Sequence, residues 1–123
     1  LLNHYPKQYC PHIRSNGFIL EREIFIDFIK TTKIPISKRD CYKLESGNSS
    51  LSNYVMNLNK RLILIDKNGF GYDIEDWINS KTYCSPGQPE LCIADNNTDL
   101  YDRSNIPNKK QMEHDVWGKI IHD

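Results

Sequence analysis

Residues 49–74 read SSLSNYVMNLNKRLILIDKNGFGYDI, and this stretch decides the fold that we expect for the chain. Its first half carries apolar residues at helical spacing, namely Leu51, Val55, Leu58 and Leu62. That spacing predicts a helix from about residue 50 to about residue 61 with one buried face. Ser49 or Ser50 is suited to cap it, because a serine hydroxyl accepts a backbone N–H at a helix start.

The second half of the stretch predicts a β-hairpin. Residues 62–65 are short and rich in β-branched side chains, and residues 70–74 alternate apolar with polar or small ones, as half-buried strands do. Between them, Asn68-Gly69 favours the paired positive φ angles of a type I′ turn. Trp77 follows the hairpin, and we expect it to pack against the core.

Two more helices are expected before this stretch. Residues 19–30 place apolar side chains on one helical stripe and end with Lys30, which suits the negative end of a helix dipole. Pro35 breaks that helix. Ser37 then has the position of an N-cap for a short helix over residues 38–44.

Three helices followed directly by an Asn-Gly hairpin resemble the winged helix-turn-helix family, over residues 19–77. The resemblance implies an α+β fold in which the hairpin is the wing. We expect an N-terminal arm at residues 1–18 and a winged helix-turn-helix domain at residues 19–80. A loop-rich extension at residues 81–123 follows, with coil over residues 94–108 and a last helix over residues 109–121.

The resemblance also implies binding to double-stranded DNA, as in a small phage or bacterial transcription regulator. In that family a recognition helix enters the major groove, and basic side chains contact phosphates. The residues expected on base edges are Ser50, Ser52, Asn53 and Asn57, and asparagine pairs bidentately with adenine. The residues expected on phosphates are Lys38, Arg39, Lys43, Lys60, Arg61 and Lys67.

Charge supports a second hypothesis, a protein-binding module on the same scaffold, such as a phage-encoded inhibitor or accessory subunit. The chain has sixteen basic and sixteen acidic residues, whereas nucleic-acid-binding domains usually carry a basic excess. Residues 50–59 contain no Lys or Arg. Charge is nevertheless uneven, with eight basic and three acidic residues between Lys30 and Lys67. Either hypothesis is compatible with a homodimer.

The cysteines support a third hypothesis, an extracellular domain of a surface or pilin-like protein. The four cysteines, Cys10, Cys41, Cys84 and Cys92, form no C-x-x-C pair. In an oxidising compartment, a disulfide between Cys84 and Cys92 is the pairing we expect. The sequence begins at Leu1 rather than Met, which would fit a removed signal or anchor. With reduced thiols the expected location is the cytoplasm.

Other classes of function lack a sequence signature. No apolar run approaches the roughly 20 residues of a membrane span. No phosphate loop, nucleophile elbow or paired-carboxylate motif occurs, so we expect no catalysis. Residues 66–77 lack the later ligands of a calcium loop, and the cysteines with His12 lack zinc-site spacing. The pairs His114-Asp115 and His122-Asp123 are interpreted as surface residues. The expectation is a binding protein without metal or cofactor.

Overall fold

The computed structural model describes residues 11–14, 16–46 and 48–122. Within these ranges the fold is α+β, with six helices and one two-stranded antiparallel sheet. The chain divides into two compact units. We call His12–Leu62 the helical unit, and the described residues from Ile63 onward the C-terminal unit. The expected domain of residues 19–80 therefore includes parts of both units, and the hairpin belongs to the C-terminal one.

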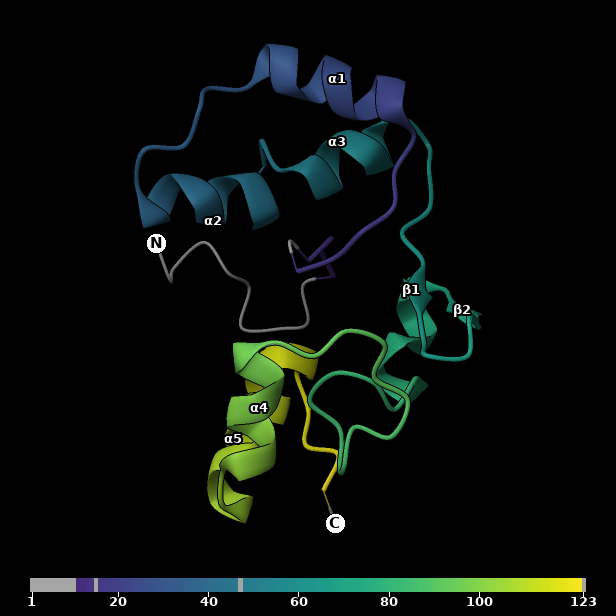
Figure 1. Ribbon diagram of the computed structural model, residues 1–123, viewed down its shortest axis with the longest axis vertical. Coiled ribbons are helices and arrows are strands. Elements are labelled where there is room, and N and C mark those ends of the chain that lie inside the picture. Colours follow the sequence, from purple (N-terminus) through teal and green to yellow (C-terminus); the bar gives the residue numbers. More distant parts are fainter. Residues whose placement is uncertain (1–10, 15, 47, 123) are drawn as a thin grey trace. The chain divides into compact units, whose positions relative to one another are not determined.

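The helical unit contains the three helices predicted for this part of the chain: α1 (Arg22–Thr31), α2 (Lys38–Ser46) and α3 (Leu51–Asn57). Helix α3 packs against both α1 and α2 (Figure 1). The buried apolar side chains of the unit are Phe28, Leu51, Val55 and Leu62. The Phe28 ring lies 5.4 Å from the Tyr54 ring, centroid to centroid. Helix α3 thus carries two of these four side chains, Leu51 and Val55.

Helix α3 ends at Asn57, earlier than the apolar spacing predicts. Asn59 takes a positive φ of 59°. Its N–H donates to the Met56 carbonyl at 2.9 Å, and the Lys60 N–H donates to the Val55 carbonyl at 3.3 Å. These two bonds form a Schellman motif, which satisfies the last carbonyls and turns the chain out of the helix. Leu58, predicted on the buried stripe, is consequently 45 % exposed.

The helix starts follow the sequence signals more closely. The Ser37 hydroxyl accepts the Asp40 N–H at 3.1 Å, and the Ser50 hydroxyl accepts the Asn53 N–H at 3.1 Å. Both serines therefore act as the predicted N-caps. Helix α1 begins at Arg22 rather than at residue 19, with Glu21 as its N-cap residue.

The C-terminal unit begins with the hairpin, β1 (Leu64–Ile65) and β2 (Gly71–Tyr72), in which Leu64 pairs with Tyr72. The predicted type I′ turn is wrong, because among residues 66–69 only Gly69 has a positive φ, of 82°. The Asp66 carboxylate shapes the turn instead. It accepts the N–H groups of Asn68 at 2.8 Å and Phe70 at 3.0 Å. Asp side chains often bond to backbone N–H groups ahead of them in this way.

After the hairpin, a 3-10 helix η2 (Ile74–Asn79) carries Trp77. Trp77 is buried, as expected, and its indole N–H donates to the Tyr72 carbonyl at 2.9 Å. The hydroxyls of Ser80 and Thr82 follow, buried and 2.8 Å apart. This part of the core is consequently rich in polar groups that bond to one another.

Two helices complete the C-terminal unit, α4 (Asn96–Arg103) and α5 (Ile106–Trp117), and they pack against each other. Helix α4 lies where coil was predicted. It is started by a capping box, in which Asp95 accepts the Thr98 N–H and the Thr98 hydroxyl accepts the Asp95 N–H. Helix α5 ends at Gly118, whose φ is 75°. None of the described helices combines the length and apolar character that crossing a bilayer requires.

Candidate functional site

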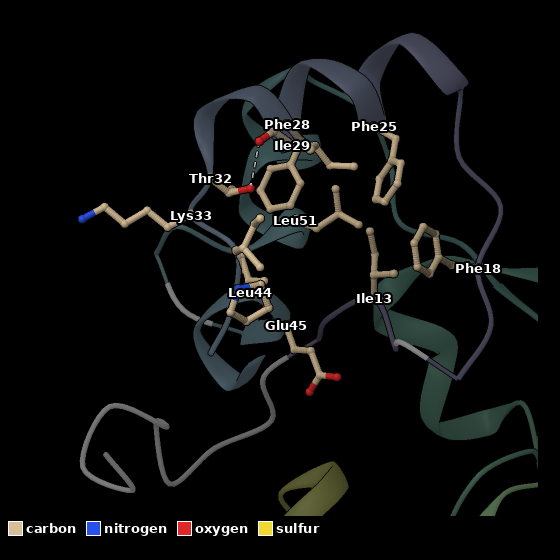
Figure 2. A pocket seen from close by; sticks show the side chains of 12 residues that line it. Ile13, Phe18, Phe25, Phe28, Ile29, Thr32, Lys33, Leu44, Glu45 and Leu51 are labelled. Carbon is tan, nitrogen blue, oxygen red and sulfur yellow. Dashed lines mark hydrogen bonds between the residues drawn. The ribbon is translucent and has the colours of Figure 1, made fainter. Parts of the chain in front are cut away.

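The helical unit has an apolar groove of about 300 Å³. Its walls come from three helices and from the segment before α1 (Figure 2). Helix α1 contributes Phe25, Phe28 and Ile29, and the floor includes Leu51 of α3. The remaining lining residues are Ile13, Phe18, Thr32, Lys33, Ile34, Pro35, Leu44 and Glu45. Residues far apart in the sequence therefore meet around one hollow.

The groove offers few polar groups to a ligand. Of its three polar lining residues, Thr32 has its hydroxyl bonded to the Ile29 carbonyl at 3.2 Å. Lys33 and Glu45 extend away from the hollow in Figure 2. The interior is therefore suited to apolar side chains rather than to a charged or strongly hydrogen-bonding group.

Several apolar residues of the groove remain in contact with solvent. Ile34 is 86 % exposed and Ile29 is 51 % exposed. Phe18 and Phe25 are also exposed, and their rings lie 6.0 Å apart at an angle of 59°. Single exposed apolar residues are ordinary, but several around one groove typically mark a binding surface.

The two units differ in charge. Residues 12–62 contain nine Lys/Arg and five Asp/Glu, whereas residues 63–123 contain six and eleven. The neutral total thus conceals a basic helical unit and an acidic C-terminal part. Five exposed cations lie on α1, on α2 and in the loop between them, at Lys30, Lys33, Lys38, Arg39 and Lys43.

Two of the predicted base-reading residues are not on an exposed face. Ser50 and Ser52 are each only 2 % exposed. Ser50 caps α3, while the Ser52 hydroxyl accepts the Ile13 N–H at 2.8 Å and donates to the Glu45 carbonyl at 3.2 Å. These serines are buried because α3 packs against both α1 and α2. Their hydroxyl hydrogen bonds stabilise the helical unit.

The two predicted asparagines have different surroundings. Asn53 is half-buried, and its amide donates to the Asn48 carbonyl at 3.1 Å. Asn57 is exposed at the end of α3. The structure therefore leaves α3 without the continuous polar face that the sequence predicts.

The predicted phosphate contacts are all exposed, and they belong to different elements. Lys38, Arg39 and Lys43 share α2, and the Lys38 ammonium lies 6.0 Å from the Tyr42 ring centroid. The Lys60 ammonium lies 3.4 Å from a carboxylate oxygen of Glu21. Arg61 follows Lys60, while Lys67 lies in the hairpin turn of the C-terminal unit.

The C-terminal unit contains a buried cluster that the sequence did not predict. Tyr101 and Glu113 are fully buried, and the Tyr101 hydroxyl donates to Glu113 Oε1 at 2.6 Å. The backbone N–H groups of Ile121 and His122 donate to Glu113 Oε2 at 2.7 and 2.9 Å. His122 Nδ1 is also hydrogen-bonded to Oε1. Glu113 thus fixes the segment after α5 against α4 and α5.

The cluster has perturbed acid–base properties. Burial acts to raise the pKa of Glu113, but hydrogen bonds from Tyr101 and from the His122 and Ile121 N–H groups outweigh it, so the pKa lies below the ordinary value. Burial, together with the bond to Glu113, raises the pKa of Tyr101. Both side chains bond within the protein, and we interpret the cluster as structural.

The described cysteines form no disulfide between Cys84 and Cys92, and the expectation of that bond is wrong. Cys84 is buried, while Cys92 is an exposed thiol. Gln88 occupies the inside of this turn, where its amide oxygen accepts the Cys84 N–H at 3.1 Å. Within the described residues, no group of three or more His, Cys, Asp or Glu side chains is arranged to hold a metal ion.

Comparison with protein-family models, with curated proteins and with solved structures found no match. The function must therefore be argued from the chemistry of the groove and of the surfaces around it.

Proposed function

We propose that the helical unit is a protein-binding module whose groove takes apolar side chains of a partner protein. One observation carries the proposal: the groove is lined mainly by apolar side chains, and Ile29 and Ile34 remain exposed at it. A partner that covers these residues removes apolar surface from water, at about 25 cal/mol for each Å² buried.

The placement of α3 supports a protein partner over DNA as the first choice. A recognition helix must present a polar outer face to base edges, whereas α3 has Leu51, Ser52 and Val55 buried. The apolar side chains that line the groove of the helical unit have no use in reading DNA bases, but they can bind apolar side chains of a protein.

A selection experiment tests the proposal. A random peptide library displayed on phage is selected on the full chain, and the enriched peptides are synthesised and titrated. We expect peptides with two or more large apolar residues, and at least a tenfold loss of affinity in Ile29→Ser. Leu58→Ser is the matched control, because Leu58 is exposed to a similar degree but does not line the groove. Equal losses in both variants, or enrichment of purely polar peptides, would contradict the proposal.

A second candidate is the DNA-binding winged helix-turn-helix function. The basic excess of the helical unit and the exposed cations of α2 favour it. In this hypothesis α2 and the Lys60-Arg61 pair contact phosphates, and the hairpin acts as the wing. A mobility-shift assay with random-sequence duplex DNA at low and moderate salt tests it. We expect binding that weakens steeply as salt is raised. Arg39→Glu should weaken this binding, and Ile29→Ser should leave it unchanged.

A further inference from the structure

We infer that the groove of the helical unit selects an acidic amphipathic segment of its protein partner. The inference rests on the proposed function and names the chemistry of the partner. In this arrangement a few large apolar side chains enter the hollow, and carboxylates on the rest of the segment face the cations beside it.

The shape of the site suits an apolar stripe rather than a single side chain. The lining comes from α1, α2 and α3, from the loop between α1 and α2, and from Ile13 and Phe18, so the hollow is walled from several sides (Figure 2). Phe18 and Phe25 border one part of it, and Ile34 and Pro35 belong to the loop between α1 and α2. Helical segments commonly dock in such grooves through apolar residues at i, i+3, i+4 and i+7.

The charge beside the groove favours carboxylates in the partner. Residues 13–51, which include every residue of the lining, contain seven cations and five carboxylates, and the excess lies between Lys30 and Lys43, with five cations and one carboxylate, Asp40. Lys33 itself lines the groove, and Lys30 lies in the last turn of α1. The carboxylate of Asp40 is held by the Ile36 N–H, which donates to it at 3.2 Å. No ion pair to a described carboxylate engages Lys30 or Lys33.

The apolar lining favours an acidic peptide over DNA as the occupant. Both are anionic, and both would be attracted by the basic excess of the helical unit. Only a peptide also supplies apolar side chains for the hollow.

Three labelled peptides of about 16 residues, or four helical turns, test the inference by fluorescence anisotropy with the full chain. The first has Leu and Phe at i, i+3, i+4 and i+7 with Asp and Glu elsewhere. The second keeps the apolar positions and replaces the acids by Lys. The third has the composition of the first in a permuted order. We expect the first to bind about tenfold tighter than the others, and more weakly as salt is raised.

Charge reversal assigns the binding to the groove. The double variant Lys30→Glu/Lys33→Glu is expected to bind the acidic peptide several-fold more weakly and the basic peptide more strongly. Lys67→Glu/Lys119→Glu is the matched control, because both lysines are exposed, both lie in the C-terminal unit and the change in net charge is the same. Circular dichroism checks that all variants keep their helix content. Equal losses in this control would overturn the inference, because the effect would then follow from net charge alone.

The remaining outcomes separate this inference from the proposed function. The acidic and basic peptides could bind equally well, and both could lose binding in Ile29→Ser. That result would overturn the inference of an acidic partner but leave the proposal of a protein-binding groove. Equal binding of the permuted peptide would overturn the amphipathic order but leave the protein-binding groove. No binding by any of the three peptides, together with no apolar peptide enriched in the phage selection, would overturn both. Displacement of the peptide by one equivalent of duplex DNA would identify a nucleic-acid surface instead. A concentration-dependent dimer that Ile29→Ser abolishes would identify a second copy of the chain as the occupant.

Discussion

The helical unit gathers exposed apolar side chains around one groove, whereas the C-terminal unit is distinguished by the polar side chains that it buries. In the first, Ile29 and Ile34 lie open at the groove. In the second, Asp66, Gln88 and Glu113 are buried, and each is bonded to neighbouring residues. The helical unit therefore has an apolar core beside an apolar groove, and the C-terminal unit has a core with many hydrogen-bonded polar groups.

This contrast separates binding from stability. An unpaired buried polar group costs about 1–3 kcal/mol, and among the described residues no buried side-chain N or O atom lacks a partner. The hydrogen bonds of these buried groups thus give the C-terminal unit a specific structure. In the helical unit, Phe28, Leu51 and Val55 form a buried apolar core, while other apolar side chains remain exposed at the groove. Mutations can test this division unit by unit.

The largest expected effect comes from the core of the helical unit. Phe28→Ala should lower the free energy of unfolding of this unit by about 3–5 kcal/mol, because it leaves a cavity beside Tyr54. Far-UV circular dichroism during urea titration measures the loss. Both tryptophans, Trp77 and Trp117, lie in the C-terminal unit, so their fluorescence should change little. Phe28→Leu is the control, with an expected loss below about 1.5 kcal/mol. A matching shift of the fluorescence transition would show that the units unfold together.

The next largest effect is expected at Glu113. Glu113→Ala removes the acceptor for the Tyr101 hydroxyl and for the N–H groups of Ile121 and His122. We expect the C-terminal unit to lose about 3 kcal/mol, measured by tryptophan fluorescence in urea. Glu113→Gln keeps an acceptor oxygen and should lose less. Unchanged midpoints in both variants would contradict the structural role of this cluster.

Acid should weaken the C-terminal unit by a smaller amount. Burial acts to raise the pKa of Asp66 and of Glu113, but hydrogen bonds outweigh it and both pKa values are lowered. Such groups stabilise the fold above the pKa of the unfolded chain, and the stabilisation is lost as pH falls through the folded pKa. The urea midpoint from tryptophan fluorescence should therefore fall between about pH 5 and pH 3. In Glu113→Gln this fall should be reduced; an identical fall would exclude Glu113 as a contributor.

The smallest effect on stability, combined with a clear effect on binding, is expected at Ile34. Because Ile34 is 86 % exposed, Ile34→Ser should change the free energy of unfolding by no more than about 0.5 kcal/mol. It should nevertheless weaken binding of the acidic amphipathic peptide several-fold. Ile36→Ser is the control, since Ile36 is 91 % exposed and does not line the groove. Equal affinities of the two variants would remove Ile34 from the binding surface.

The local elements of this fold could be predicted from the sequence. Apolar spacing located α1 and α3, serine caps located α2 and the start of α3, and Asn68-Gly69 located the hairpin. Helix α4 was missed, because its residues are mostly polar and its capping box lies in a stretch rich in Asn and Asp. The turn type was also missed, because the Asp66 side chain, not the Asn-Gly backbone preference, forms the turn.

The candidate site could be predicted only in part. The cations of α2 are exposed and their contact with phosphates stays a prediction, while Ser50 and Ser52 were assigned to the wrong environment. Polarity suggests exposure, yet a serine at a helix start is often buried where its hydroxyl bonds to the backbone. Glu113 was missed for a similar reason, since nothing near it in sequence reveals the Tyr101 hydroxyl that it binds.

The sequence by itself determined where helices and turns form, because capping, proline breaks and apolar periodicity act over a few residues. Only the tertiary structure decided which faces are open. Ile13, Ile29, Leu44 and Leu51 come from different segments, and the groove exists because those segments pack without filling the space between them. In the same way, Glu113 became a buried acceptor because α4 and the segment after α5 bring donors to it. Burial depends on contacts between distant residues, and no local pattern records them.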